Sequence, residues 1–301
     1  MKFDNAAVLA LAAGASAQNM SICDKYTTAL LKENTAMNQQ TLLTLVVNTA
    51  VIGNYTKPNV GIAVPGLLAP GTGKYAGVNL LPYFNGMLAS TNSGGSMGIS
   101  VNFLDGGGAT PLMNNTAANN TSSAQYRLLT HLYEYFGYLL GCSQFGMTTM
   151  PYAGSTNMYQ VHKFMALDVN EVGWFIQNVG LSAASFGVSN DDVMAVGTAL
   201  NNAFGYRCSP AMSIPKTATA EPQSICIADD CPISPNATCS LYSPVVKPMK
   251  ANSTTSGAGS TASSGAMSSS SVQPFTGAAS SFAPVGATLA AAVFGLAAYL
   301  L

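Results

Sequence analysis

From Ala251 to Leu301, the end of this 301-residue chain, there is not one Lys, Arg, Asp or Glu. Ser, Thr, Gly and Ala dominate residues 251–281, and such a segment has too few large apolar side chains to form a packed core. We therefore predict a disordered Ser/Thr-rich stalk over 251–281, which confines any folded domain to the residues before it.

The final segment, 282–301, contains the apolar stretch PVGATLAAAVFGLAAYLL. A single-pass membrane helix usually carries Lys or Arg on its cytoplasmic side, and none follows this stretch. Small residues, a polar spacer and a terminal apolar tail form the pattern of a glycosylphosphatidylinositol (GPI) signal, whose tail is removed. A tail anchor or an ordinary membrane-spanning helix is the alternative. The candidate attachment sites for the lipid are Ser269, Ser270, Ser271 and Gly277.

Residues 1–18 have the pattern of a secretory signal peptide. A lysine precedes a short apolar run, Ala6 to Ala13, and small residues follow near Ala15 to Ala17. The run is too short to span a bilayer. We therefore predict that the mature chain begins at about residue 18 or 19 and is secreted. With the GPI signal, this places the protein at the outer face of the plasma membrane or in the cell wall, with the membrane as its partner through the lipid.

Secretion gives the cysteines of this chain a specific meaning. An even number of cysteines in an oxidising compartment predicts disulfides, here three, with the pairing left open. Because oxidised cysteines do not bind metals, we expect Cys226, Cys231 and Cys239 to belong to a disulfide-linked loop and not to a zinc site. The six cysteines are Cys23, Cys142, Cys208, Cys226, Cys231 and Cys239.

Seven asparagines stand in N-x-Ser/Thr sequons and are predicted to carry glycans. Only 8% of the residues are charged, so glycans would supply much of the solvation of the surface. The sequon asparagines are Asn19, Asn54, Asn114, Asn119, Asn120, Asn236 and Asn252.

Between the two terminal signals and the stalk about 230 residues remain, a length that favours one domain. Helical periodicity predicts a mainly α-helical domain over 19–210, interrupted at about 53–123 by a Gly-, Pro- and Asn-rich insertion. In the insertion we expect long loops, a small hairpin and a helical turn at NLLPYFNGML. A Cys-containing extension follows over 211–250.

Several helices have clear sequence signals. Residues 26–52 predict two helices or one interrupted helix, and QYRLLTHLYEYFGYLLG is apolar on two sides of a helix. Asp168 with Glu171 three residues later is a capping box that begins a further helix. Ser189 with Asp192 repeats this arrangement for the last helix of the domain.

Most enzyme classes lack their motifs in this chain. There is no G-x-S-x-G and no H-E-x-x-H, and PGTGKY lacks the first glycine and the Ser/Thr of a phosphate loop. Asp105 and Glu134 are candidate carboxylates, but nothing in the sequence pairs them as a glycosidase requires. The net charge of −1 gives no basic footprint for nucleic acid. We therefore expect no catalytic residues, and the sequence favours a protein without enzyme activity over an enzyme.

The segment PYAGSTNMYQVHKFMALDVNEVGWFIQNV resembles the proximal region of truncated haemoglobins, in which Tyr-x-Gly and Met precede the haem-binding histidine. NLLPYFNG, YEYFGYLLGC and FGVSNDDVMAVGTAL resemble, in order, the segment before the distal helix, the distal helix, and the final turn and helix of that family. The likeness runs from about Leu42 to Phe204. It implies a globin-like fold with haem as cofactor.

The resemblance also implies roles for individual residues. His162 would be the proximal ligand of the haem iron, and His131 would lie near a propionate. Asn48 would occupy the polar distal position that hydrogen-bonds a small ligand. The residues facing the iron from the distal side would be Leu128, Leu132, Tyr135 and Phe136.

The whole precursor is similar to GPI-anchored surface proteins of filamentous fungi, a likeness that implies no particular activity. The alternative function is therefore a non-catalytic wall, adhesion or structural surface protein with a globin-like domain that has lost its cofactor. Cell-wall glycans would be its partners. In that case His162 is an ordinary core or surface histidine, as a lone histidine near a helix commonly is.

Overall fold

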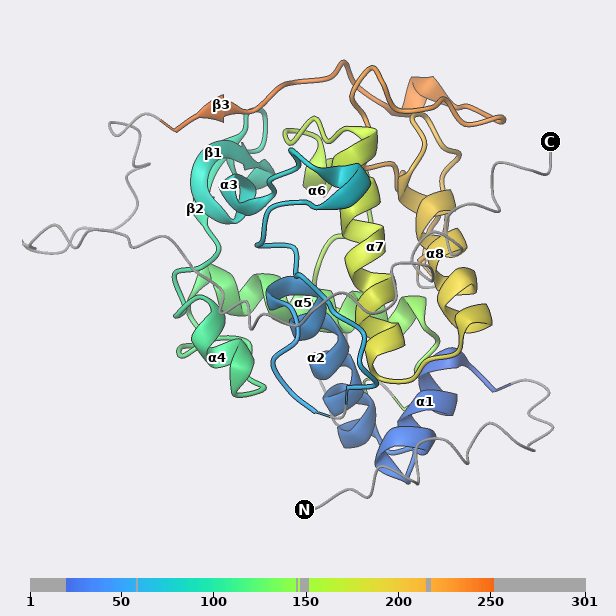
Figure 1. Ribbon diagram of the computed structural model, residues 1–301. Coiled ribbons are helices and arrows are strands. Elements are labelled where there is room, and N and C mark those ends of the chain that lie inside the picture. Colours follow the sequence, from blue (N-terminus) through green and yellow to red (C-terminus); the bar gives the residue numbers. More distant parts are fainter. Residues whose placement is uncertain (1–19, 58, 145, 147–151, 215–217, 252–301) are drawn as a thin grey trace, which may run out of the picture. The chain divides into compact units, whose positions relative to one another are not determined.

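The computed structural model describes residues 20–57, 59–144, 146, 152–214 and 218–251 (Figure 1). Several sequence predictions lie outside these residues: the signal peptide, Asn19, Asn252, the stalk, the GPI signal and the four lipid-attachment candidates. In the described part of the chain, no helix has the length and apolar character needed to cross a membrane.

The described chain is rich in helices and also contains a small three-stranded sheet. In chain order the elements are α1 (Ile22–Leu31), α2 (Ala36–Ile52), η2 (Gly73–Tyr75), α3 (Leu81–Phe84), β1 (Asn85–Thr91), η3 (Asn92–Gly94), β2 (Ile99–Asn102), α4 (Ala109–Met113), α5 (Ala124–Leu139), α6 (Met158–His162), α7 (Val169–Ser185), α8 (Asn190–Phe204), η4 (Cys239–Leu241) and β3 (Met249–Lys250). The prediction of a mainly α-helical chain is confirmed in part: the described chain is rich in helices, but it also carries the small sheet.

The long helices begin where the sequence predicted. The Asp168 carboxylate accepts the backbone N–H groups of Asn170 and Glu171, and the Glu171 carboxylate accepts the N–H of Asp168, so the capping box of α7 is complete. Ser189 caps α8 by accepting the backbone N–H of Asp192, but the reciprocal half of a capping box is not formed there, because the backbone N–H of Ser189 donates to the Tyr26 hydroxyl. Residues 26–52 form parts of two helices, because the chain turns at Lys32, whose φ is +74°.

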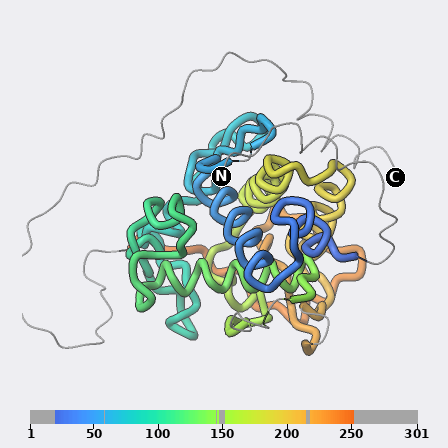
Figure 2. Tube along the Cα trace, turned by 90° about the horizontal axis from the view of Figure 1, so that it is seen from below, coloured from blue at the N-terminus to red at the C-terminus, as the bar shows by residue number. Residues whose placement is uncertain are grey.

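The core lies where α2, α5, α7 and α8 pack together (Figure 2). Trp174 of α7 and Leu200 of α8 are both fully buried there. A hydrogen bond also joins α2 to α7: the Ser182 hydroxyl donates to the carbonyl of Val46 at 2.6 Å. Burial of apolar side chains on all four helices is the main source of stability.

The insertion contains the predicted hairpin and helical turn. β1 pairs antiparallel with β2, with Ala89 opposite Ser100, and α3 supplies the helical turn just before β1. The sequence did not predict α4 or the third strand, β3, which pairs antiparallel with β1 on its other side. The sheet order is therefore β2-β1-β3.

All six cysteines form disulfides, as predicted. The pairs are Cys23–Cys142, Cys208–Cys239 and Cys226–Cys231. The first ties α1 to the end of α5, and the other two lie within and beside the extension that follows α8. This extension is part of the domain core, since Ile225 and Cys226 are buried in the main hydrophobic cluster.

Candidate functional site

His162 is the last residue of α6 and is partly buried. Its Nδ1 lies 2.8 Å from the carbonyl oxygen of Met158, one turn earlier. A carbonyl accepts only, so Nδ1 carries the proton and Nε2 keeps a lone pair. Burial lowers the pKa of His162, although the bond to Met158 opposes this effect. His162 is therefore a neutral imidazole, oriented as many metal-binding histidines are.

The surroundings of His162 are set by the short helix α6. This helix packs against β1 and η3, so it lies over the sheet side of the insertion. The next apolar residue along the chain, Phe164, is buried and packs against Gly98 in the β1–β2 connection. Besides the sheet, α6 contacts the C-terminal extension, where the ring centroids of Tyr159 and Tyr242 lie 4.7 Å apart.

The residues expected on the distal side of a haem lie elsewhere in the core. Leu128 and Leu132 of α5 line one apolar hollow with Val51 of α2, and its volume is about 10 Å³. Leu132 and Phe136 line a second hollow of about 20 Å³, between α2, α5 and α7. Each has room for one or two water molecules at most. His162 lines neither hollow.

Asn48 has a structural role in the fold. Its side chain is fully buried, Oδ1 accepts the Tyr133 hydroxyl at 2.6 Å, and Nδ2 donates to the carbonyl of Leu112 at 3.1 Å. Burial raises the pKa of Tyr133 above its ordinary value. The Asn48 amide therefore joins α2, α4 and α5, and its oxygen is already occupied.

The two remaining members of the predicted site also have other partners. The Tyr135 hydroxyl donates to Gln223 Oε1 at 3.0 Å, which ties α5 to the C-terminal extension. His131 lies edge-on to Tyr152, with 5.9 Å between ring centroids. Burial, and next the nearby charge of Arg127, lowers the pKa of His131.

These positions allow a test of whether the residues fit a haem. A haem needs His162 and the leucines of α5 on opposite faces of one slot, and ligand pockets generally enclose about 300 to 1,000 Å³. The two hollows described here are far smaller, and the histidine is in contact with neither. The described residues therefore do not fit a haem in this arrangement, and haem binding remains a prediction from the resemblance alone.

The candidate carboxylates are also separated. Both oxygens of Asp105 accept backbone N–H groups at the start of α5, from Ala124 and Gln125 at 3.1 and 3.0 Å. Glu134 lies ten residues further along that helix, which places the two about 15 Å apart. Glycosidase carboxyls lie less than about 10 Å apart. Among the described residues, no group of three His, Cys, Asp or Glu could hold a metal ion.

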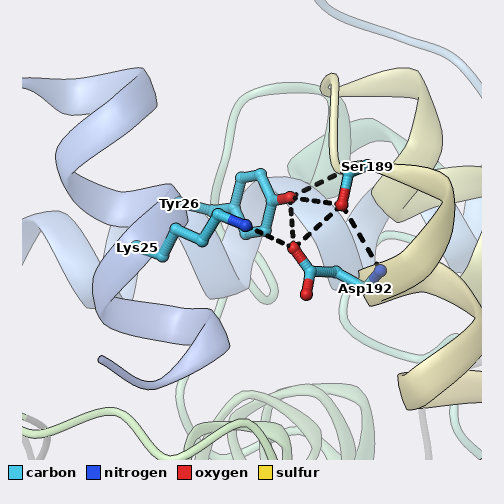
Figure 3. Close-up of polar contacts among 4 residues, drawn as sticks. All are labelled: Lys25, Tyr26, Ser189 and Asp192. Atoms are coloured by element: carbon cyan, nitrogen blue, oxygen red, sulfur yellow. Dashed lines mark hydrogen bonds and ion pairs between the residues drawn. The ribbon is translucent and has the colours of Figure 1, made fainter. Parts of the chain in front are cut away.

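A polar cluster between α1 and α8 was not predicted as a unit (Figure 3). Lys25 Nζ and the Tyr26 hydroxyl of α1 both approach Asp192 Oδ2, at 2.7 and 2.6 Å, and the Ser189 hydroxyl donates to the same oxygen at 2.9 Å. The sequence identified Ser189 and Asp192 as a helix cap, but no local pattern connects them with α1. The Ser189 hydroxyl donates to a carboxylate, and Ser189 lines neither of the two hollows described above. We therefore interpret the four residues Lys25, Tyr26, Ser189 and Asp192 as a structural link between α1 and α8, here called the clasp.

The glycosylation sequons share one property in the structure. Every sequon asparagine in the described ranges is exposed. Four lie in the insertion, one of them directly after α2 and three around α4 and before α5, and the fifth lies in the C-terminal extension: Asn54, Asn114, Asn119, Asn120 and Asn236.

No protein-family model, no curated protein and no solved structure matches the chain.

Proposed function

We propose that this protein is a secreted, N-glycosylated component of the cell surface without a catalytic role, attached through a GPI lipid. The observation that carries the proposal is the exposure of all five described sequon asparagines. The two buried asparagines among the described residues, Asn48 and Asn178, do not stand in sequons. An exposed asparagine can receive a glycan without any opening of the core.

Two further features support an extracellular role. All six cysteines are paired, which suits an oxidising compartment. The two hollows described above hold about one or two waters each, so neither of them has room for a substrate. A compact, stapled and glycosylated domain on a Ser/Thr-rich stalk is suited to a wall, adhesion or structural function, with cell-wall glycans as partners.

The test is expression of the full chain in glycosylating eukaryotic cells, followed by treatment of intact cells with phospholipase C. We expect the enzyme to release the protein, and peptide N-glycosidase to lower its mass. A chain truncated after Ala251 is the matched control, and it should enter the medium without phospholipase. Retention of the full chain on cells after treatment, with residues 282–301 still present by mass spectrometry, would refute the lipid anchor.

Haem binding is the second candidate function, and it rests on the resemblance of the segment around His162 to the proximal region of truncated haemoglobins; the bond from Nδ1 to the Met158 carbonyl is compatible with it. The proposal of a non-catalytic surface protein predicts no His162-dependent haem spectrum. A haemin titration therefore distinguishes the two functions.

A further inference from the structure

Two of the sequons overlap. Asn119-Asn120-Thr121 and Asn120-Thr121-Ser122 place two acceptor asparagines side by side, and the sequence pattern does not choose between them. We propose that Asn120, and not Asn119, carries the glycan. This inference rests on the proposed function, because it assumes that the chain passes through a glycosylating compartment.

The side chain of Asn119 is packed against the backbone. Gly107 has a φ of +112°, and a Cβ placed on it would collide with Asn119 Nδ2 and lie 3.0 Å from Asn119 Cγ. The Asn119 carboxamide thus covers the surface of Gly107 that a side chain would otherwise occupy. The Asn119 backbone N–H donates to the carbonyl of Gly106 at 2.8 Å, which fixes this position. A sugar on Asn119 Nδ2 would have to move the carboxamide away from Gly107.

Asn120 has the opposite arrangement. Its Oδ1 accepts two hydrogen bonds from Ser122, from the backbone N–H at 2.7 Å and from the hydroxyl at 2.6 Å. These bonds form an Asx turn that holds the oxygen against the chain. Nδ2 is bonded to the other side of Cγ and points away from that turn. Since Asn120 is exposed, a sugar on Nδ2 can extend into solvent with both bonds intact.

The chemistry is a group transfer from a polyprenyl-diphosphate-linked oligosaccharide. A bond forms between Asn120 Nδ2 and C1 of the first sugar, the bond from C1 to the diphosphate oxygen breaks, and Nδ2 loses one proton while the lipid diphosphate leaves. The carboxamide oxygen keeps its lone pairs for Ser122, and Nδ2 keeps one N–H. A chain modified at Asn119 would have to fold with its carboxamide displaced, so it would be depleted among secreted molecules.

The experiment uses the full chain secreted from glycosylating cells. Peptide N-glycosidase in heavy-oxygen water converts each glycosylated asparagine to a labelled aspartate, and peptide sequencing by mass spectrometry locates the label. Two matched variants separate the sequons: Asn119→Gln leaves Asn120-Thr121-Ser122 intact, and Asn120→Gln leaves an intact sequon at Asn119.

We expect the label on Asn120 in the unmodified sequence and full occupancy in Asn119→Gln. In Asn120→Gln, occupancy of this loop should fall about tenfold, the ratio that corresponds to about 1.4 kcal/mol. Label on Asn119 at a level equal to or above that on Asn120, with Asn54, Asn114 and Asn236 occupied, would overturn this inference and leave the proposed function standing. A chain with no label at any of the five positions would overturn both.

Discussion

The Tyr26 hydroxyl donates a 2.6 Å hydrogen bond to Oδ2 of Asp192, a residue 166 positions further along the chain. This bond joins the first helix of the domain to the last one in the helical core. Lys25 and Ser189 approach the same carboxylate oxygen, so one atom receives three partners (Figure 3). Charge-assisted hydrogen bonds of this kind are stronger than neutral ones.

We predict that Asp192→Asn lowers the free energy of unfolding by about 1 to 2 kcal/mol, because several charge-assisted bonds are lost at a partly exposed site. Urea denaturation with the disulfides intact measures this. Lys25→Ala should cost less than about 1 kcal/mol, since the Lys25 side chain is 48% exposed and its ion pair is solvated. Equal losses in the two variants would show that the ion pair, and not the Tyr26 and Ser189 bonds, stabilises the clasp.

The clasp should also weaken in acid. Burial works to raise the pKa of Asp192, but hydrogen bonds from Lys25, Tyr26 and Ser189 outweigh it and hold the pKa below the ordinary 3.8. A carboxyl with a lowered pKa in the folded state stabilises that state above its ordinary pKa, and the contribution disappears as the pH falls through the folded value. The stability difference between the natural chain and Asp192→Asn should therefore shrink as the pH falls below about 3.8.

Glu171 should show the opposite pH dependence. Burial, assisted by the charge of Asp168, raises its pKa above 4.5, even though hydrogen bonds from the Asp168 N–H and the Tyr83 hydroxyl oppose the shift. A raised carboxyl pKa means that ionisation costs stability as the pH rises through it. The stability of Glu171→Gln relative to the natural chain should therefore increase as the pH rises above about 4.5, while the loss of the hydrogen bond to the Asp168 N–H works against this gain at every pH. A difference that does not change with pH would contradict this reasoning.

Removal of a disulfide should cost more stability when the loop that it closes is longer, with a logarithmic dependence on loop length. Cys23 and Cys142 are separated by 119 residues, and Cys226 and Cys231 by five. Loop-closure entropy gives about 5 kcal/mol for the first and about 2 kcal/mol for the second. Replacing each pair by serine and comparing the urea midpoints measures the order. A larger loss for the short loop would show that buried packing of Cys226 outweighs the entropy term.

Asn48 and Tyr133 should behave as a coupled pair. Asn48→Ala leaves the buried Tyr133 hydroxyl without its acceptor, which should cost about 1 to 3 kcal/mol. Adding Tyr133→Phe removes the orphaned group, so the double variant should lose less than the sum of the single losses. Additive losses in this double-mutant cycle would mean that the hydrogen bond of 2.6 Å contributes nothing measurable.

A haemin titration of the domain, followed between about 350 and 700 nm, tests the cofactor directly. From the positions of His162 and the α5 leucines we expect no saturating Soret band, and an unchanged spectrum in His162→Ala. A saturating band that this variant abolishes would establish haem binding. It would also require α6 to move toward α5, and His131 and Asn48 would be the next residues to replace.

The sequence predicted those parts of the fold that depend on neighbours in the chain. The capping box at Asp168 and the cap at Ser189 are formed within four residues, so they could be identified from the letters alone. β3 could not be predicted, because two residues have no periodicity and their partner, β1, lies about 160 positions earlier.

The candidate site was harder to predict for a related reason. The resemblance places His162 just before a helix, but in the structure His162 is the last residue of the short helix α6, which packs against β1 and η3 of the insertion. The burial of Asn48 could not be predicted from the sequence either, since its partners Tyr133 and Leu112 come from two other helices. The clasp of Tyr26 with Asp192 joins two helices whose sequences show no mutual signal.

The pairing of β3 with β1 determines how the domain would respond to tension. Beyond β3, the Ala251 N–H donates to the carbonyl of Met87 at 2.9 Å, so a pull on the chain beyond this point would first separate β3 from β1. The separation would stop at Cys239, which is covalently joined to Cys208 just after α8. At most the segment from Cys239 to Ala251, about 40 Å when extended, could be drawn out before the load reached the helical core. Separation of β3 from β1 would thus let the C-terminal segment extend under load, and the Cys208–Cys239 disulfide would set the limit of that extension.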